Sequence, residues 1–226
     1  MNDCAQPSAK TPASKEWTSS TRCQLLGLAF APAGLLPLAE WLSWRESGLH
    51  HLGGLLALIV ILSFPGALLG LPICFIGGCV PRFRRYAAWG LVCLSVAVAS
   101  FFVGFRLSLP VRRVALEQVM VRAESLIEAI RKHEAATGRP PSNLAELVPG
   151  YLSVIPTPGI GTASEYFYRR PAPEADLEGN AWMLDVMPPV VGIGFDRFIY
   201  LPKQNYPHEG WGGVLERMGT WAYVHE

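Results

Sequence analysis

Three tracts without charged residues decide what this chain can fold into. No Asp, Glu, Lys or Arg occurs from Cys23 to Ala39, from Leu52 to Val80 or from Ala87 to Phe105. A helix needs about 20 residues to cross a hydrocarbon core of roughly 30 Å. Only 16% of the chain is charged and half of it is hydrophobic, a balance that is unusual for a soluble protein. We therefore predict an integral membrane protein with spanning helices at about 23–42, 52–79 and 87–107, after a polar tail at 1–22.

The first tract is the shortest and contains Pro32 and Pro37. These features leave three interpretations open: a kinked span, a re-entrant segment and an uncleaved signal anchor. Of these, we favour a span. Pro65 and Pro72 in the second tract indicate a kinked or early-ending helix, which neighbouring helices accommodate in lipid.

The Lys and Arg residues that flank the tracts predict orientation, because such residues favour the cytoplasmic side. Three precede the first tract, one follows it, and three separate the second tract from the third: Lys10, Lys15 and Arg22; Arg45; and Arg82, Arg84 and Arg85. This pattern places the tail in the cytoplasm of a bacterial cell and the C-terminal half in the periplasm, anchored in the inner membrane. The residues Arg106, Arg112 and Arg113 argue against it, since they follow the third tract. The triplet at 82–85 could also bind anionic lipid.

The segment 110–226 has the pattern of a soluble α+β domain. It opens with apolar residues at helical three- and four-residue steps: Leu116, Val119, Met120, Ala123, Leu126, Ile127 and Ile130. Gly138 is a plausible C-terminal cap, and Pro140 and Pro141 prevent continuation. Whether this helix continues the third span through Pro110 is left open by the sequence.

A second short helix is expected at 142–148, with Ser142 as its N-cap. Four β-rich runs follow at 165–170, 181–187, 195–201 and 220–225. In the second run Trp182, Leu184 and Val186 share one face, and Met183, Asp185 and Met187 share the other. The expected domain is a long amphipathic helix packed on an antiparallel meander.

Part of this domain resembles the pseudopilins of type II secretion, over about residues 111–170. The residues that carry the resemblance are Ala129, Ile130, Gly138, Arg139, Pro141, Leu144, Glu146 to Pro149, Tyr151, Leu152, Ile155, Pro156 and Tyr166 to Tyr168. In that family a membrane helix continues into a long amphipathic helix, and a turn, a short helix and a small antiparallel sheet follow. Here two further hydrophobic tracts come first, and Ala87–Phe105 lacks the glutamate of the pilin helix. The resemblance thus implies a domain shape and an envelope setting, and not a pilus subunit.

No group of residues in the sequence has the pattern of a catalytic, metal-binding or phosphate-binding site. The C-terminal half contains His133, His208 and His225, with Asp185, Asp196, Glu165 and Glu209 as conceivable partners. No two of these histidines have metal-ligand spacing, and Cys74 and Cys79 match no zinc pattern. The glycine-rich loop at 210–213 lacks the context of a phosphate-binding loop. We expect no cofactor. The net charge of +1 gives no case for nucleic acid as a partner.

The densest polar and aromatic run lies at 195–206. Together with the earlier tyrosines and one tryptophan it gives a candidate ligand or partner surface: Tyr166, Tyr168, Asp196, Arg197, Phe198, Tyr200, Tyr206 and Trp211. The alternative is a core strand followed by an ordinary loop. The leading hypothesis is a non-catalytic domain that contacts an envelope protein. A sensory or ligand-binding domain is the second hypothesis, and a hydrolase that uses His208 or His133 is the third.

Overall fold

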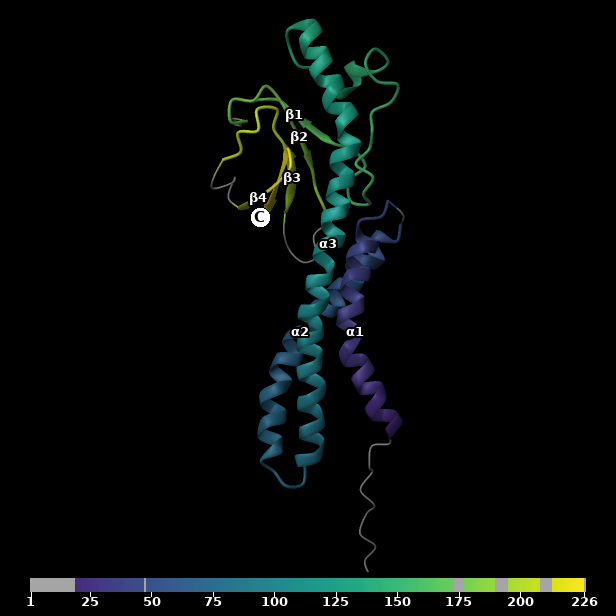
Figure 1. The fold of residues 1–226 in the computed structure, drawn as a ribbon, viewed down its shortest axis with the longest axis vertical. Coiled ribbons are helices and arrows are strands. Elements are labelled where there is room, and N and C mark those ends of the chain that lie inside the picture. The colour runs from purple at the N-terminus through teal and green to yellow at the C-terminus, as the bar shows by residue number, and fades with distance from the viewer. Residues whose placement is uncertain (1–18, 47, 173–176, 190–194, 208–212, 226) are drawn as a thin grey trace, which may run out of the picture.

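The computed structural model describes residues 19–46, 48–172, 177–189, 195–207 and 213–225. Three helices are long and apolar enough to cross a membrane: α1 (Ser19–Ser43), α2 (His50–Gly78) and α3 (Arg84–Thr137). They pack against one another in the lower half of the molecule (Figure 1). The three predicted apolar helices are therefore present, and each is a candidate membrane span by length and composition. The first tract lies in one continuous helix that includes Pro32 and Pro37.

The bundle turns its large apolar side chains outward. Such residues occur on all three helices, among them Leu28, Phe30, Leu62, Leu69, Ile73, Phe75, Ile76, Phe102 and Phe105. An outward apolar surface of this extent is what a helix bundle needs in lipid and what a water-soluble protein avoids. A lipid bilayer is therefore the environment that these helices suit.

Small residues let the helices approach closely. A Cβ atom on Gly53 of α2 would lie 2.6 Å from the carbonyl oxygen of Ala39 in α1. A Cβ atom on Gly104 of α3 would likewise collide with the carbonyl oxygen of Pro32. Backbone contact at small residues is the usual way in which membrane helices pack.

Helix α3 settles the question of Pro110. It is a single helix of 54 residues that contains this proline, and it is roughly 80 Å long at 1.5 Å per residue. Its lower part belongs to the bundle and its upper part crosses the sheet domain (Figure 1). The predicted apolar face is confirmed, because all of its residues are buried apart from the half-buried Met120. Gly138, with φ of 74°, caps the end and donates its N–H to the carbonyl oxygen of Glu134 at 2.8 Å.

The sheet has five strands: β1 (Phe167–Arg169), β2 (Met183–Val186), β3 (Arg197–Tyr200), β4 (Val214–Met218) and β5 (Trp221–His225). All pairings are antiparallel, and the order is β1-β2-β3-β5-β4. The four expected strands are present. These four, β1, β2, β3 and β5, pair in chain order as the expected antiparallel meander, and the departure is β4, which is added at the edge beyond β5. Strand β4 was not predicted.

The two faces of the sheet bury different clusters. Toward α3, Trp182, Leu184 and Val186 join the main core, as predicted from the alternation in β2. The opposite face carries a smaller cluster of Leu177, Met183, Ile199, Leu201 and Val224. Asp185 of β2 is also on this second face and is fully buried.

The short helix is a single 3-10 turn, η1 (Leu144–Leu147), with Asn143 rather than Ser142 at its N-cap. The expectation for Ser142 is therefore corrected. The backbone N–H of Ser142 instead donates to Oε2 of Glu146 at 3.0 Å. This hydrogen bond is the main reason why the pKa of Glu146 is lowered.

The end of α1 is built into the sheet domain. Trp44, just past the last residue of α1, is buried in the same core cluster as α3 and the sheet. Gly161, in the loop before β1, approaches the carbonyl oxygen of Arg45 so closely that a Cβ atom would not fit. The loop between α1 and α2 therefore lies on the same side of the bundle as the sheet.

Candidate functional site

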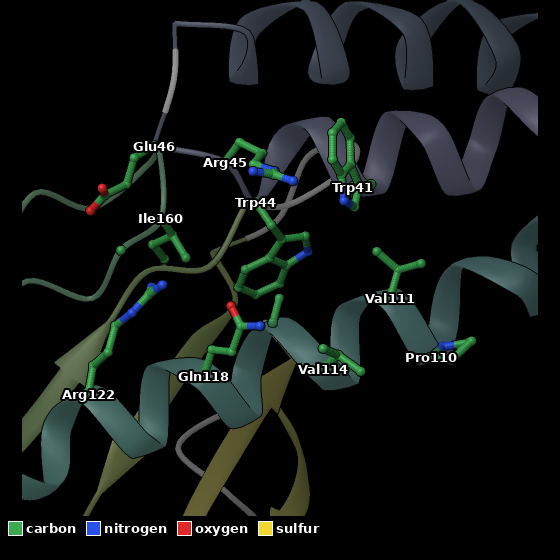
Figure 2. A pocket seen from close by; sticks show the side chains of 12 residues that line it. Trp41, Trp44, Arg45, Glu46, Pro110, Val111, Val114, Gln118, Arg122 and Ile160 are labelled. Atoms are coloured by element: carbon green, nitrogen blue, oxygen red, sulfur yellow. The ribbon is translucent and has the colours of Figure 1, made fainter.

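A groove with chemically useful side chains lies between the end of α1 and the middle of α3. It has a volume of about 730 Å³. Helix α3 forms one wall, with Pro110, Val111, Val114 and Gln118, and the opposite wall comes from Trp41 and Trp44 (Figure 2). Gly159 and Ile160 close the end nearest the sheet. We call this site the interfacial groove, because it lies where the apolar bundle meets the soluble domain.

Two guanidinium groups border the interfacial groove. That of Arg45 lies over the ring of Trp41, 4.2 Å from its centroid. That of Arg122 donates from Nη1 to the carbonyl oxygen of Pro158 at 2.7 Å. One carboxylate is also present, since Glu46 lines the groove and accepts a hydrogen bond from the hydroxyl of Thr157 at 3.3 Å. Positive charge therefore exceeds negative charge in the groove.

A buried ion pair sets the position of the Trp44 wall. Glu40 of α1 is 4% exposed, and its Oε1 accepts from Trp44 Nε1 at 3.0 Å and from Arg112 Nε at 2.9 Å. A buried carboxylate needs such donors because an unpaired charge away from water is costly. The pair fastens α1 to α3 directly beside the groove.

A second depression of about 700 Å³ lies between α3 and the β4-β5 hairpin. Its lining includes Arg113, Glu216, Tyr223 and His225. The hydroxyl of Tyr223 donates to Oδ2 of Asp196 at 2.7 Å, and burial is the main cause that raises the pKa of this tyrosine. The imidazole of His225 is 3.7 Å from both Asp196 and Glu216, which is long for a hydrogen bond. The described lining of this depression contains no Ser, Thr, Cys or Lys side chain.

Much of the candidate aromatic surface is buried in the structure. Tyr166, Phe198 and Tyr200 are buried in the main core. Tyr166 donates to the carbonyl oxygen of Val119 at 2.8 Å, and burial raises its pKa. Their packing agrees with the core-strand alternative, and a role in recognition stays a hypothesis.

Of the other members, Tyr168 packs at the edge of the same core, and Asp196 and Tyr206 have other partners. Tyr168 donates to the carbonyl oxygen of Pro141 at 2.8 Å. The hydroxyl of Tyr206 accepts from the backbone N–H of Leu201 at 2.9 Å and donates to the carbonyl oxygen of Thr220 at 2.8 Å. Asp196 pairs with Tyr223. Trp211 is outside the described residues.

Of the candidate histidines, the two that the structure describes, His133 and His225, have separate partners. His133 is buried on α3, where its Nε2 is 3.8 Å from Glu146. His208 and Glu209 fall outside the described residues. Within the described ranges no group of three His, Cys, Asp or Glu side chains could hold a metal ion, and Cys74 and Cys79 are free thiols.

Asp185 pairs with arginines and not with a histidine, the partner considered in the sequence analysis. It is fully buried, and its carboxylate pairs with Arg169 at 3.0 Å and with Arg197 at a still shorter distance. Asp185 and Arg197 therefore form part of a charged cluster on the second face of the sheet, and no histidine is involved in the contacts described.

Sequence reasoning missed the interfacial groove, although a signal existed. Trp41, Trp44 and Arg45 follow the first apolar tract directly, and tryptophan with arginine at the end of such a tract is typical of a membrane interface. The partner wall, 70 residues farther on in α3, carries no comparable signal.

Comparisons of the chain with protein-family models, with curated proteins and with solved structures found no match.

Proposed function

We propose that this protein is a bacterial inner-membrane protein that holds a non-catalytic, pseudopilin-like domain in the periplasm for contact with another envelope protein. The observation that carries the proposal is α3, which runs unbroken from the membrane bundle into the core of the sheet domain. A helix of this kind holds the domain at a set distance from the bilayer, as a structural module requires.

The order of elements supports the pilin-like part of the proposal. The long helix ends at Gly138, a turn with Pro140 and Pro141 follows, and η1 then leads into an antiparallel sheet. This is the order that the resemblance implies. The two additional helices α1 and α2 pack against the membrane part of α3, which supports an anchor function rather than assembly into a filament.

The distribution of arginines supports the orientation. Arg22 begins α1, and its guanidinium lies 5.2 Å from the ring centroid of Trp89 near the start of α3. This end of the bundle also carries Arg82, Arg84 and Arg85, and it is opposite to the sheet (Figure 1). On the sheet side, Arg112 pairs with the buried Glu40, which gives this arginine a structural role apart from topology, and Arg113 forms an exposed pair with Glu117.

Orientation is tested by fusing alkaline phosphatase or a green fluorescent protein after Glu226. Phosphatase activity with no fluorescence is expected, since only the phosphatase becomes active in the periplasm. Fluorescence without phosphatase activity would overturn the periplasmic assignment and the envelope role with it.

An apolar loop at the membrane-distal end is the best candidate for the partner contact. Val148, Tyr151 and Val154 are exposed, with Val154 at 70%. Tyr151 packs edge-on against His133 near the end of α3, with the ring centroids 5.5 Å apart. Exposed apolar side chains that cluster on a soluble domain commonly mark protein contacts.

A photo-crosslinking amino acid at position 154 tests this contact in intact cells. We expect a discrete adduct from position 154 and none from position 124, since Glu124 is an exposed control site on α3. Equal adducts at the two positions, or none at position 154, would contradict a specific contact through this loop.

The sensory or ligand-binding alternative is favoured by one observation, the interfacial groove. Its volume of about 730 Å³ lies within the usual range for small-molecule sites. The two functions are compatible, because Val148, Tyr151 and Val154 of the distal loop do not line the groove.

A further inference from the structure

Two exposed apolar helix faces lead from the bundle to the interfacial groove. On α3, Leu107, Val111 and Val114 are spaced by four and three residues and so share one face, and Leu107 and Val114 are exposed. On α1, Leu38 and Trp41 are three residues apart and both are exposed. An acyl chain that lies along these faces would end in the groove.

Two guanidinium groups that border the groove are suited to a phosphate group. Arg45 comes from the end of α1 and Arg122 from α3, two turns beyond Val114. Figure 2 shows Arg122 at the sheet end and Arg45 beside Trp41, with the Glu46 carboxylate at the outer margin. Guanidinium groups form paired hydrogen bonds with phosphate oxygens, and the hydrogen bond to Pro158 uses only one nitrogen of Arg122.

The surroundings are typical of a lipid headgroup site. Tryptophan side chains favour the headgroup level of a bilayer, and Trp41 and Trp44 form one wall of the groove. Trp44 is fixed by its hydrogen bond to Glu40, so this wall is rigid before any ligand arrives. A preformed wall lowers the entropic cost of binding.

We propose that the interfacial groove binds one anionic phospholipid, with the phosphate diester between Arg45 and Arg122 and an acyl chain along Leu107, Val111 and Val114. The proposal requires only that the bundle is in a membrane. It does not depend on which side the domain faces or on its protein partner, so its failure leaves the proposed function intact.

The test is native mass spectrometry of the full-length protein in a neutral detergent, titrated with dioleoyl phosphatidylglycerol or dioleoyl phosphatidylcholine. We expect phosphatidylglycerol to bind at least tenfold more tightly. The double variant R45Q/R122Q should lose roughly 30-fold in affinity for phosphatidylglycerol, since each basic residue near a headgroup contributes about a factor of five.

The matched control is Arg113→Gln. Arg113 is on α3 close to Arg112, is 75% exposed and lines the other depression, so its loss should change affinity less than twofold. The variant Arg122→Lys keeps the charge without the planar fork and should give an intermediate affinity. Equal affinity for the two lipids, or an equal loss in R113Q and in the double variant, would overturn the proposal. Displacement of the lipid by millimolar inorganic phosphate would also overturn it, because the site would then be one for free phosphate.

A second measurement needs no change to the arginines. Phosphatidylglycerol with brominated acyl chains should quench the fluorescence of wild-type protein more strongly than brominated phosphatidylcholine. Trp41→Phe, at the exposed rim of the groove, should remove most of this difference. The same difference in the variant would place the lipid elsewhere and refute the site.

Discussion

Glu40 of α1 and Arg112 of α3 are 72 residues apart in the chain, yet Nε of Arg112 donates to Oε1 of Glu40 at 2.9 Å. The glutamate side chain is 5% exposed and the arginine side chain 27%. The pair lies at the boundary between the bundle and the sheet domain, and Trp44 donates to the same oxygen. One buried carboxylate with two donors therefore fastens α1 to α3 at this boundary.

Removal of Arg112 should cost more stability than removal of Glu40. Arg112→Gln leaves a buried carboxylate with only Trp44 as a donor, and we expect a loss of about 3 kcal/mol in the free energy of unfolding. Glu40→Gln leaves an arginine that water can reach, and a loss of roughly 1 kcal/mol is expected. Thermal unfolding of both variants and of the double variant in detergent micelles checks this order. Equal losses would show that the carboxylate is not effectively buried.

The Asp185 cluster gives a second asymmetric prediction. Arg197 is 17% exposed and Arg169 is 48% exposed, and both pair with the fully buried Asp185. Arg197→Ala should therefore destabilise the protein by about 2–3 kcal/mol, and Arg169→Ala by less than about 1 kcal/mol. Denaturant unfolding of the full-length protein measures both. Since Trp44 belongs to the domain's core, an isolated sheet domain is not a suitable substitute. A larger loss of stability in Arg169→Ala than in Arg197→Ala would show that Arg169 is the main partner of Asp185.

Local periodicity made much of the fold predictable. The buried face of α3 and the two faces of β2 were expected because repeats of 3.6 and of two residues are visible in short windows. Strand β4 has no such pattern, since it is an edge strand whose side chains are exposed or half-buried. Its hydrogen bonds to β5 hold it in place, and a window of sequence does not show them.

Long-range packing decided what could not be predicted. Pro110 removes one helical hydrogen bond and favours a kink or a break, but α3 passes through it unbroken. Arg112, two residues later, is fixed by Glu40, and Leu116 is packed in the main core. The groove depends on the same contacts, because its walls come from α1 and α3. The sequence alone does not show that α1 packs beside this part of α3.

Two adjacent glycines of α2 should differ in their tolerance to alanine. A Cβ atom on Gly53 would lie 2.6 Å from Ala39 O and from Ser43 N of α1, whereas one on Gly54 would meet nothing within 4 Å. Gly53→Ala should push α1 and α2 apart and cost about 1–3 kcal/mol. Gly54→Ala should be neutral or stabilise the helix by up to about 1 kcal/mol. Melting temperatures in the same detergent compare them directly. Similar melting temperatures for both variants would mean that α1 and α2 do not cross at Gly53.

We expect ionisation of Tyr168 to lower the stability of the protein at alkaline pH. Burial raises the pKa of its hydroxyl from 10.0 to about 12, against the opposing effect of Arg170. The unfolded chain ionises near pH 10, so the stabilisation is complete below that pH and is lost as the pH rises toward 12. Tyr168→Phe cannot ionise, and its free energy of unfolding should fall less steeply over this interval.

The free energy of unfolding of Tyr168→Phe should also be lower by roughly 1 kcal/mol at neutral pH, because the hydrogen bond to Pro141 is lost. Denaturant unfolding at pH 8, 10 and 11 separates the two effects. Part of the alkaline slope must remain in the variant, since burial also raises the pKa of Tyr166, Tyr206 and Tyr223. An unchanged slope in Tyr168→Phe would show that the Tyr168 hydroxyl is as well hydrated in the folded protein as in the unfolded chain.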